Sequence, residues 1–404
     1  MGKKYNFSKL INRENTLSIK WDMREKFFGR EDILPLWVAD SDWQTAPEIK
    51  KELISTAEHG IYGYSCADDS SKESVQNWLD KRFDLRLKKE WIVFDSGVVP
   101  AINFSLKTIT DAGDGVIIQP PVYRPFYTAV KNNNCTLVEN NLILEDNHYK
   151  IDFAGLEALI DEWKDKKENL KALIFCSPHN PVGRVWKKEE LQKLIDILSR
   201  EGIYLLSDEI HADIVLSDYK HLPSLKVLLS DAKYKDYRKK VISYLSASKT
   251  FNIAGLHTSY TIIESDSLRN KYEKEKRGFT SGNSPFGLKA LKTAYDKGED
   301  WLEEQLLYLE NNKKFLKEFF ENNIPEIKVV EQEGTYLCWL DCRSLPFEND
   351  KKLREFFINK ARIGLNPGIW FGKAGSGFMR LNTACPRKRL EKGLKRIEKA
   401  VKEL

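Results

Sequence analysis

Four segments of this 404-residue chain place clusters of polar side chains directly after a short apolar run. The segments are residues 95–100, 177–184, 207–213 and 246–252. Each apolar run is typical of a buried β-strand, and ligands bind beyond the carboxyl ends of neighbouring parallel strands. We therefore predict that the four segments line one pocket.

The segment 246–252 contains a candidate nucleophile, Lys249. Most of the 65 lysines and arginines are expected to be solvated surface charges. Lys249 differs because it follows a predicted buried strand and two serines, Ser246 and Ser248. Burial beside apolar or cationic groups lowers the pKa of a lysine and gives the neutral amine that forms a Schiff base.

The segment 207–213 places carboxylates at the end of a predicted apolar strand. A carboxylate in such a place is costly unless a cation pairs with it. These residues alone are compatible with three interpretations. They are a solvated acidic turn, a site for a cationic group, and a metal site formed by Asp208, His211 and Asp213. No further ligands complete a metal set, so we predict no metal.

The other two segments are rich in turn-forming residues. Gly97 precedes a predicted apolar helix, and the free N–H groups at a helix N-terminus favour a phosphate, although an ordinary strand–helix turn has the same pattern. Two prolines flank Asn180 and predict a rigid loop at a strand end. A structural turn explains these prolines but does not require an asparagine between them.

The elements that position these segments alternate along the chain. Amphipathic helices such as 187–200, with apolar residues at helical spacing, separate several short apolar strands. This alternation predicts an α/β fold with a mostly parallel seven-stranded sheet that is covered on both faces. The seven strands are expected at residues 91–94, 115–118, 136–138, 172–176, 203–206, 241–245 and 258–263.

The chain is longer than one hydrophobic core usually serves, which favours more than one domain. Residues 1–46 are predicted to form an N-terminal arm with one short buried strand that packs with the small domain. Residues 47–285 are predicted to form the large domain and residues 286–404 a smaller α+β domain. The last part is expected to contain a long charged helix over 286–322, strands at 328–330, 336–340 and 377–381, and a basic helix over 388–403.

Composition argues against several classes of partner. A net charge of +5 without a dense basic block implies no nucleic acid partner, whereas small anionic ligands are compatible. No apolar run follows Lys3 and Lys4, so neither a secretory signal nor a membrane segment is expected. Six scattered cysteines indicate reduced thiols and a cytoplasmic location, and the close pair Cys338 and Cys342 lacks a second pair to complete a metal site.

The motifs themselves resemble a known family. SPHNPVG at 177–183, SDEIHAD at 207–213 and SASKTFNIAG at 246–255 are similar to signatures of the class I/II aminotransferases. More narrowly, they resemble the pyridoxal 5′-phosphate (PLP)-dependent cystathionine β-lyases of the MalY/PatB type, which have fold type I. Further similarities occur in order along the chain at 36–43, 62–64, 120–123, 334–337 and 378–382.

The resemblance implies a PLP cofactor and three catalytic residues. Lys249 is expected to bind PLP as a Schiff base and to move the substrate Cα proton, and Asp208 to pair with the pyridine nitrogen. Tyr123 is expected to stack on the ring. Asn180 is expected to bind the ring 3-oxygen, and His211, which stands where the aminotransferases usually have a tyrosine, is also expected to bind the cofactor.

The same resemblance assigns the phosphate and the substrate. The phosphate is expected to be bound by the backbone of Gly97 and Val98, by Ser246 and Ser248, and by Tyr64 from the other subunit of a homodimer. His257 stands where many aminotransferases have an arginine phosphate ligand, which leaves that contact open. Arg380 is expected to bind the substrate carboxylate with its planar fork, next to Asn180 and Tyr64.

The function implied is α,β-elimination from L-cystathionine or a related cysteine S-conjugate, giving a thiol, pyruvate and ammonia. One alternative is a PLP-dependent aminotransferase, which needs the same Lys249, Asp208 and Arg380. The stretch 37–40 and His211 favour the lyase. A second alternative is a PLP-binding regulatory protein without turnover.

Overall fold

Seven short strands form the central sheet of the computed structural model, which describes residues 5–280 and 282–404. Their order across the sheet is β2-β10-β9-β8-β7-β3-β4. Only β10 runs antiparallel to its neighbours, so the predicted mostly parallel sheet is confirmed. The strands are β2 (Ile92–Asp95), β3 (Gly115–Ile118), β4 (Thr136–Glu139), β7 (Leu170–Cys176), β8 (Tyr204–Asp208), β9 (Val241–Leu245) and β10 (Ser259–Ile263).

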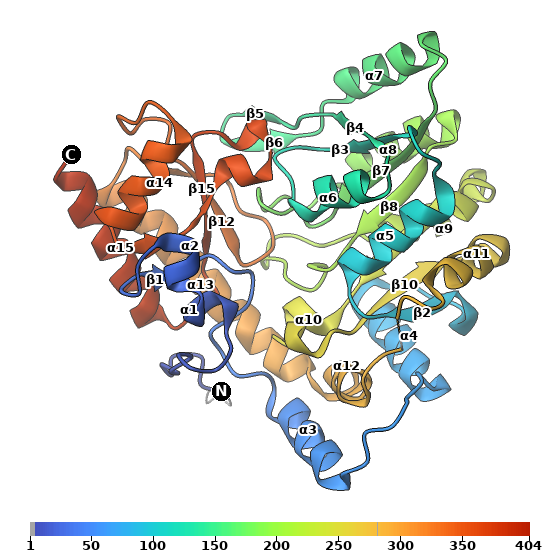
Figure 1. Cartoon of the computed structure of the whole chain (residues 1–404), viewed down its shortest axis with the longest axis horizontal. Helices are drawn as coiled ribbons and strands as arrows, with labels where there is room; N and C mark the ends of the chain where they lie inside the picture. The colour runs from blue at the N-terminus through green and yellow to red at the C-terminus, as the bar shows by residue number, and fades with distance from the viewer. Residues whose placement is uncertain (1–4, 281) are drawn as a thin grey trace.

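Helices cover both faces of this sheet (Figure 1). Side chains alternate along β3, so that Val116 and Ile118 pack in one core and Ile117 in the other. Because both of its faces are buried, β3 is continuously apolar, whereas the edge strand β4 is largely exposed. One core contains α5 (Val98–Ile109), α6 (Pro125–Asn132) and α11 (Asp266–Lys276), and the other contains α7 (Phe153–Asp165), α8 (Lys188–Glu201) and α9 (Ser224–Leu229).

The C-terminal part contains a smaller antiparallel sheet of order β11-β12-β15-β14. The arm packs against this part, since β1 (Leu34–Pro35) pairs in parallel with β13 (Ile363–Gly364) (Figure 1). The remaining elements here are α1 (Ile19–Asp22), α2 (Arg24–Phe28), β11 (Lys328–Val329), β12 (Leu337–Asp341), α14 (Asp350–Asn359), β14 (Asn366–Pro367), β15 (Phe378–Asn382) and α15 (Arg387–Lys402).

The single long helix predicted over 286–322 is wrong. The chain forms α12 (Pro285–Lys297) and α13 (Glu299–Asn323), with Gly298 between them. Glycine is a poor helix former, and a Cβ at this position would lie 2.5 Å from the ring of Phe251. The two helices therefore separate at a residue that must be small.

The break bears on the domain boundary. Helix α12 packs against α3 (Pro47–His59) and α4 (Asp69–Phe83), which belong to the large part of the chain. The division into arm, large domain and small domain remains a proposal, and this packing favours starting the small domain at Glu299 rather than at 286. Residues 1–4 of the proposed arm lie outside the described residues.

Across the described residues, no helix has the length and apolar character needed to cross a bilayer.

Candidate active site

A cavity of about 370 Å³ lies at the carboxyl ends of the central strands. Strands β7, β8 and β9 are neighbours and parallel, which brings the segments that follow them together. All four segments singled out in the sequence contribute to the lining. The lining residues are Ala39, Ser96, Gly97, Val98, Val99, Pro100, Tyr123, Cys176, Asn180, Asp208, Ile210, His211, Ser246, Ser248, Lys249, Ala254, His257 and Thr258.

Lys249 enters the cavity from α10 (Ala247–Thr250), a short helix that follows β9 directly. Ser246 caps this helix, because its hydroxyl accepts a hydrogen bond of 3.0 Å from the backbone N–H of Ser248. The Nζ atom of Lys249 donates to the carbonyl oxygen of Ala39 at 2.8 Å. Burial lowers the pKa of Lys249, which increases the fraction of neutral amine.

Asp208 is the last residue of β8 and is buried in the wall of the cavity. Its Oδ1 accepts from the backbone N–H of Ile210 at 3.1 Å. Within residues 5–280 and 282–404, no lysine, arginine or histidine nitrogen lies within 4.0 Å of this carboxylate. Burial therefore raises the pKa of Asp208 to about 7. A ligand with a protonated ring nitrogen would supply the missing cation.

Arg380 lies on β15 and is joined to the cavity through Asn180. Its guanidinium donates to Asn180 Oδ1 at 2.8 Å, to Asn366 Oδ1 at 2.7 Å and to the carbonyl of Trp37 at 3.0 Å. No carboxylate of the described residues lies within 4.0 Å of it, and its Nε has no hydrogen-bond partner there. Burial lowers the pKa of Arg380 to about 10. A ligand carboxylate would pair with this buried cation.

One end of the cavity is lined by groups that suit a phosphate. Gly97 and Val98 stand at the start of α5, whose first backbone N–H groups have no partner within the helix. Ser246 donates to the carbonyl of Thr258 at 2.7 Å and lies 2.7 Å from the hydroxyl of Ser248. These hydroxyls and amides share the lining with His257.

Tyr123 and His211 complete the polar lining of the cavity. Burial raises the pKa of Tyr123 and lowers the pKa of His211 well below its ordinary value. The imidazole is therefore neutral, and its Nδ1 has no hydrogen-bond partner among the described residues. Its ring lies edge-on to Tyr336, with 5.8 Å between the ring centroids.

Comparison with known proteins gives the family. The family described as aminotransferase class I and II matches residues 32–397. The chain belongs to this family. It is 37% identical to cystathionine beta-lyase PatB of Bacillus subtilis (strain 168), over 98% of this chain and 100% of PatB. It is 32% identical to protein MalY of Escherichia coli (strain K12), over 98% of this chain and 99% of MalY.

A solved structure agrees with this membership. The crystal structure of cystalysin from Treponema denticola, which contains a pyridoxal 5′-phosphate cofactor, superimposes with a TM-score of 0.92. The two chains are 39% identical, and 99% of each is covered. The predicted family and fold type I are therefore confirmed.

Two of the predicted site residues, Tyr64 and Arg380, are not among the residues that line the cavity, and only Arg380 is joined to it through Asn180. Tyr64 lies between α3 and α4 and is fully exposed. Its predicted contact with the phosphate requires a second copy of the chain and stays a prediction.

The sequence did not indicate that backbone groups of the N-terminal arm contribute to the candidate site. The carbonyl of Ala39 accepts from Lys249 and also from the hydroxyl of Tyr336 at 2.8 Å, and the carbonyl of Trp37 accepts from Arg380. Every residue has a backbone carbonyl, so the sequence cannot indicate which carbonyl makes a contact. The similarity at 36–43 and 334–337 singled out both stretches but did not indicate these contacts. Asn366, which holds Arg380, had no signal at all.

Proposed function

We propose that the protein is a PLP-dependent C–S β-lyase that cleaves L-cystathionine or a related cysteine S-conjugate to a thiol, pyruvate and ammonia. The observation that carries the proposal is one cavity containing both Lys249, with its lowered pKa, and Asp208, buried without a cation. Similarity to PatB over the whole chain supports elimination as the reaction.

The residues present fit the cofactor. Bound PLP supplies an electron sink for the charge that develops at the substrate Cα. Asp208 would pair with the ring nitrogen, Asn180 would bind the 3-oxygen, and Tyr123 and His211 would contact the ring. Gly97, Val98, Ser246 and Ser248 would bind the phosphate, and Lys249 would hold the cofactor covalently.

The chain's own groups would then bind the substrate and move its protons. Arg380, fixed by Asn180 and Asn366, binds the substrate carboxylate. Lys249, released when the substrate amine takes its place on the cofactor, would remove the Cα proton as a neutral amine, and the carbonyl of Ala39 would orient that amine. The Cβ–S bond then breaks, sulfur leaves with the bonding electrons and takes up a proton, and the three-carbon remainder is hydrolysed to pyruvate and ammonia.

The proposal includes a homodimer with shared active sites. Tyr64 is fully exposed and Tyr62 is also exposed, although large apolar and aromatic side chains are usually covered. A second copy that covers this segment would bring Tyr64 to the phosphate end of its partner's cavity. All six cysteines are free, in keeping with the proposed cytoplasmic location.

The test is pyruvate release from L-cystathionine by the purified holoenzyme, without a 2-oxo acid, in an assay coupled to lactate dehydrogenase. We expect steady pyruvate production that Lys249→Ala abolishes together with the absorbance of the enzyme-bound cofactor. Amino transfer that depends on an added 2-oxo acid, with no pyruvate in its absence, would show an aminotransferase instead. Pyruvate production retained by Lys249→Ala would overturn the assignment of Lys249.

A further inference from the structure

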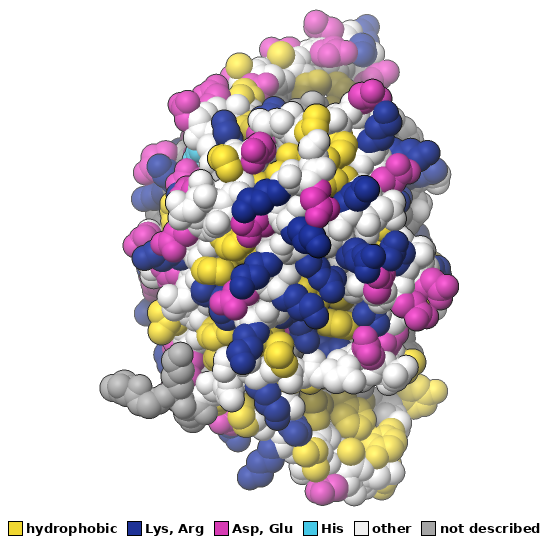
Figure 2. All heavy atoms as spheres, turned by 90° about the vertical axis from the view of Figure 1, so that its left-hand side faces the viewer, with side chains coloured by type: hydrophobic (Ala, Val, Ile, Leu, Met, Phe, Trp, Pro, Cys, Tyr) yellow, Lys and Arg dark blue, Asp and Glu magenta, His cyan; other side chains and the backbone are white. Residues whose placement is uncertain are grey.

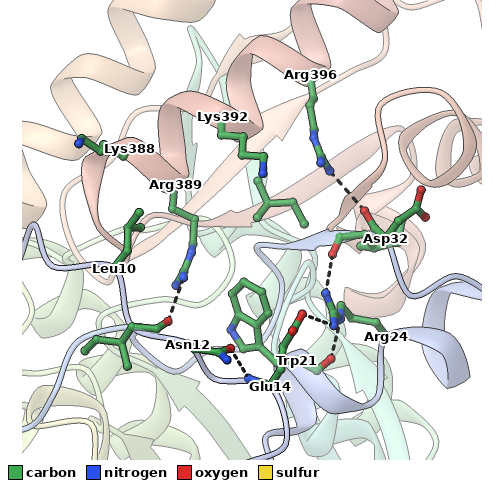
Figure 3. Close-up of a pocket in the computed structure, with 13 residues that line it drawn as sticks. Leu10, Asn12, Glu14, Trp21, Arg24, Asp32, Lys388, Arg389, Lys392 and Arg396 are labelled. Carbon is green, nitrogen blue, oxygen red and sulfur yellow. Dashed lines mark hydrogen bonds and ion pairs between the residues drawn. The ribbon is translucent and has the colours of Figure 1, made fainter.

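A second cavity, of about 530 Å³, lies between the N-terminal arm and α15, and Figure 3 shows it. None of its lining residues belongs to the catalytic cavity. The arm contributes the floor and α15 contributes the roof. The lining residues are Leu10, Ile11, Asn12, Glu14, Trp21, Arg24, Asp32, Ile33, Leu34, Lys388, Arg389, Lys392 and Arg396.

The lining has a marked excess of positive charge. Five of these residues are cationic and two are carboxylates, which leaves a formal excess of three positive charges. Figure 2 shows the face of the molecule that includes α15, with lysines and arginines gathered at its centre. An excess of this kind favours an anionic ligand.

Three of the cations form a row on α15. Lys388, Lys392 and Arg396 follow one another at a spacing of four residues, so they share one face of the helix, where like charges destabilise it. Among the described residues, no carboxylate lies within 4.0 Å of any of them. Further along the same helix, Lys399 and Lys402 pair with Glu403 and Glu398 respectively. The three cations of the row are thus left without a carboxylate partner, as are Arg387 and Lys395 elsewhere on the described helix.

The guanidinium groups of the cavity are held in place by the protein. Arg396 donates to the carbonyl of Arg362 at 2.9 Å. Arg389 pairs with Asp42 at 2.7 Å and lies over the ring of Trp21, at 4.5 Å from its centroid. Figure 3 shows Arg389, Lys392 and Arg396 reaching from α15 toward the arm, with Trp21 beneath them. Groups fixed in this way lose little freedom when a ligand binds.

The arm side of the cavity carries both apolar and polar groups. Its apolar residues are Leu10, Ile11, Trp21, Ile33 and Leu34, and its polar residues are Asn12, Glu14, Arg24 and Asp32, of which Arg24 and Glu14 pair with each other. A volume of about 530 Å³ lies within the usual range for a small-molecule site. The cavity therefore combines a cationic roof with a partly apolar floor at the scale of one small ligand.

We propose that this cavity binds a small organic phosphate, with the dianionic phosphate between Lys392 and Arg396 and the apolar body against Trp21 and Leu34. The site is separate from the catalytic cavity, so the proposal does not rest on the lyase function. Ligand binding joins the arm to α15 and therefore stabilises the folded protein.

The test is isothermal titration calorimetry of phenyl phosphate into the PLP-saturated full-length enzyme, in which the cofactor already fills the catalytic phosphate site. We expect one saturable site per chain, with binding about tenfold weaker in Lys392→Ala, since a charge-assisted hydrogen bond is lost. Lys392→Glu should abolish binding. Lys392 is exposed, so neither change disturbs a core.

Lys395→Ala is the matched control, because Lys395 is an exposed lysine of the same helix that does not line the cavity. It should bind as the wild type does, and inorganic phosphate should bind more weakly than phenyl phosphate because it lacks the apolar body. The proposal is overturned if the wild type shows no saturable binding or if Lys392→Glu keeps it. Equal weakening by Lys395→Ala, or equal affinity for the two phosphates, would also overturn it.

Discussion

Two buried aspartates, one in the arm and one in the catalytic cavity, have pKa values shifted in opposite directions. Asp42 ion-pairs with Arg13 at 2.7 Å, Lys20 at 3.2 Å and Arg389 at 2.7 Å. Burial opposes its ionisation, but these three cations outweigh that effect and lower the pKa of Asp42 to about 2. Asp208 is equally buried and has no such cation, so burial raises its pKa to about 7.

The difference in pKa distinguishes a carboxylate with a structural role, Asp42, from one that is available to a ligand, Asp208. The carboxylate of Asp42 is satisfied inside the protein and joins α1, within the arm, to α15. The carboxylate of Asp208 is left to be satisfied by what enters the cavity. Ionisable groups with a shifted pKa and no partner inside the protein are concentrated at functional sites. The loss of stability that such a group causes is retained there because the group acts on a ligand.

Asp208→Asn is expected to give the largest effect on activity. The amide cannot stabilise a protonated ring nitrogen, so kcat for pyruvate release should fall about a thousandfold. The midpoint of thermal unfolding should stay the same or rise, because a buried carboxylate without a cation is removed. Normal turnover in this variant would show that Asp208 does not act on the cofactor, and the two aspartates would then not differ in role.

Asp42→Asn is the matched change in the arm and should act on stability. It leaves the buried Arg389 without a carboxylate and Arg13 and Lys20 with Asp40 alone, which should lower the free energy of unfolding by about 3 kcal/mol. Denaturant titration measures this value. An unfolding free energy equal to that of the wild type would show that the cluster around Asp42 contributes nothing to the fold.

The two aspartates should also give opposite dependences of stability on pH. The folded-state pKa of Asp42 is depressed, so its contribution is present above pH 4 and is lost as the pH falls from about 4 to 2, in total about 2 kcal/mol. The folded-state pKa of Asp208 is raised, so the cofactor-free protein should lose stability as the pH rises from about 4 to 7. Urea titrations of cofactor-free wild type and Asp208→Asn across this range measure the second effect, which the variant should lack.

Arg380→Lys should give the smallest of these effects. Lysine keeps the charge but cannot reproduce the three hydrogen bonds of the planar fork, so KM for the amino acid substrate should rise about tenfold with a smaller change in kcat. Arg343→Lys serves as the control, since this exposed arginine pairs with Asp341 outside the cavity. Equal changes in KM for the two variants would contradict the assigned role of Arg380.

The sequence was most informative where a strand and the functional residue that it positions are close together in the chain. The apolar run 241–245 predicts β9, because burial of both sheet faces leaves a continuous apolar run, and the proposed nucleophile Lys249 follows four residues later. The segments after β7 and β8 were predictable for the same reason. Membership of the family supplied the roles that spacing alone left open.

Direct contacts between distant parts of the chain were harder to predict. The resemblance placed Arg380 and Asn180, which are 200 residues apart, at the same substrate, but their hydrogen bond depends on how the two sheets are placed. The contact of Lys249 with Ala39 involves a backbone carbonyl, so the residue type at position 39 does not indicate it. The hairpin of β5 (Ile143–Glu145) and β6 (His148–Lys150) was also missed, although Asp-Asn at its turn is a recognised signal for positive φ.

The most direct test of the central claim is the titration of Asp208 itself. Carbon-13 NMR of the cofactor-free protein, labelled at the aspartate carboxyl carbons, reports each carboxylate, and Asp208→Asn assigns the resonance. The account predicts a midpoint near pH 7 for Asp208, well above that of Asp42 at about 2. A midpoint for Asp208 at the ordinary aspartate value of about 3.9 would contradict it, because the carboxylate would then already have its partner within the protein.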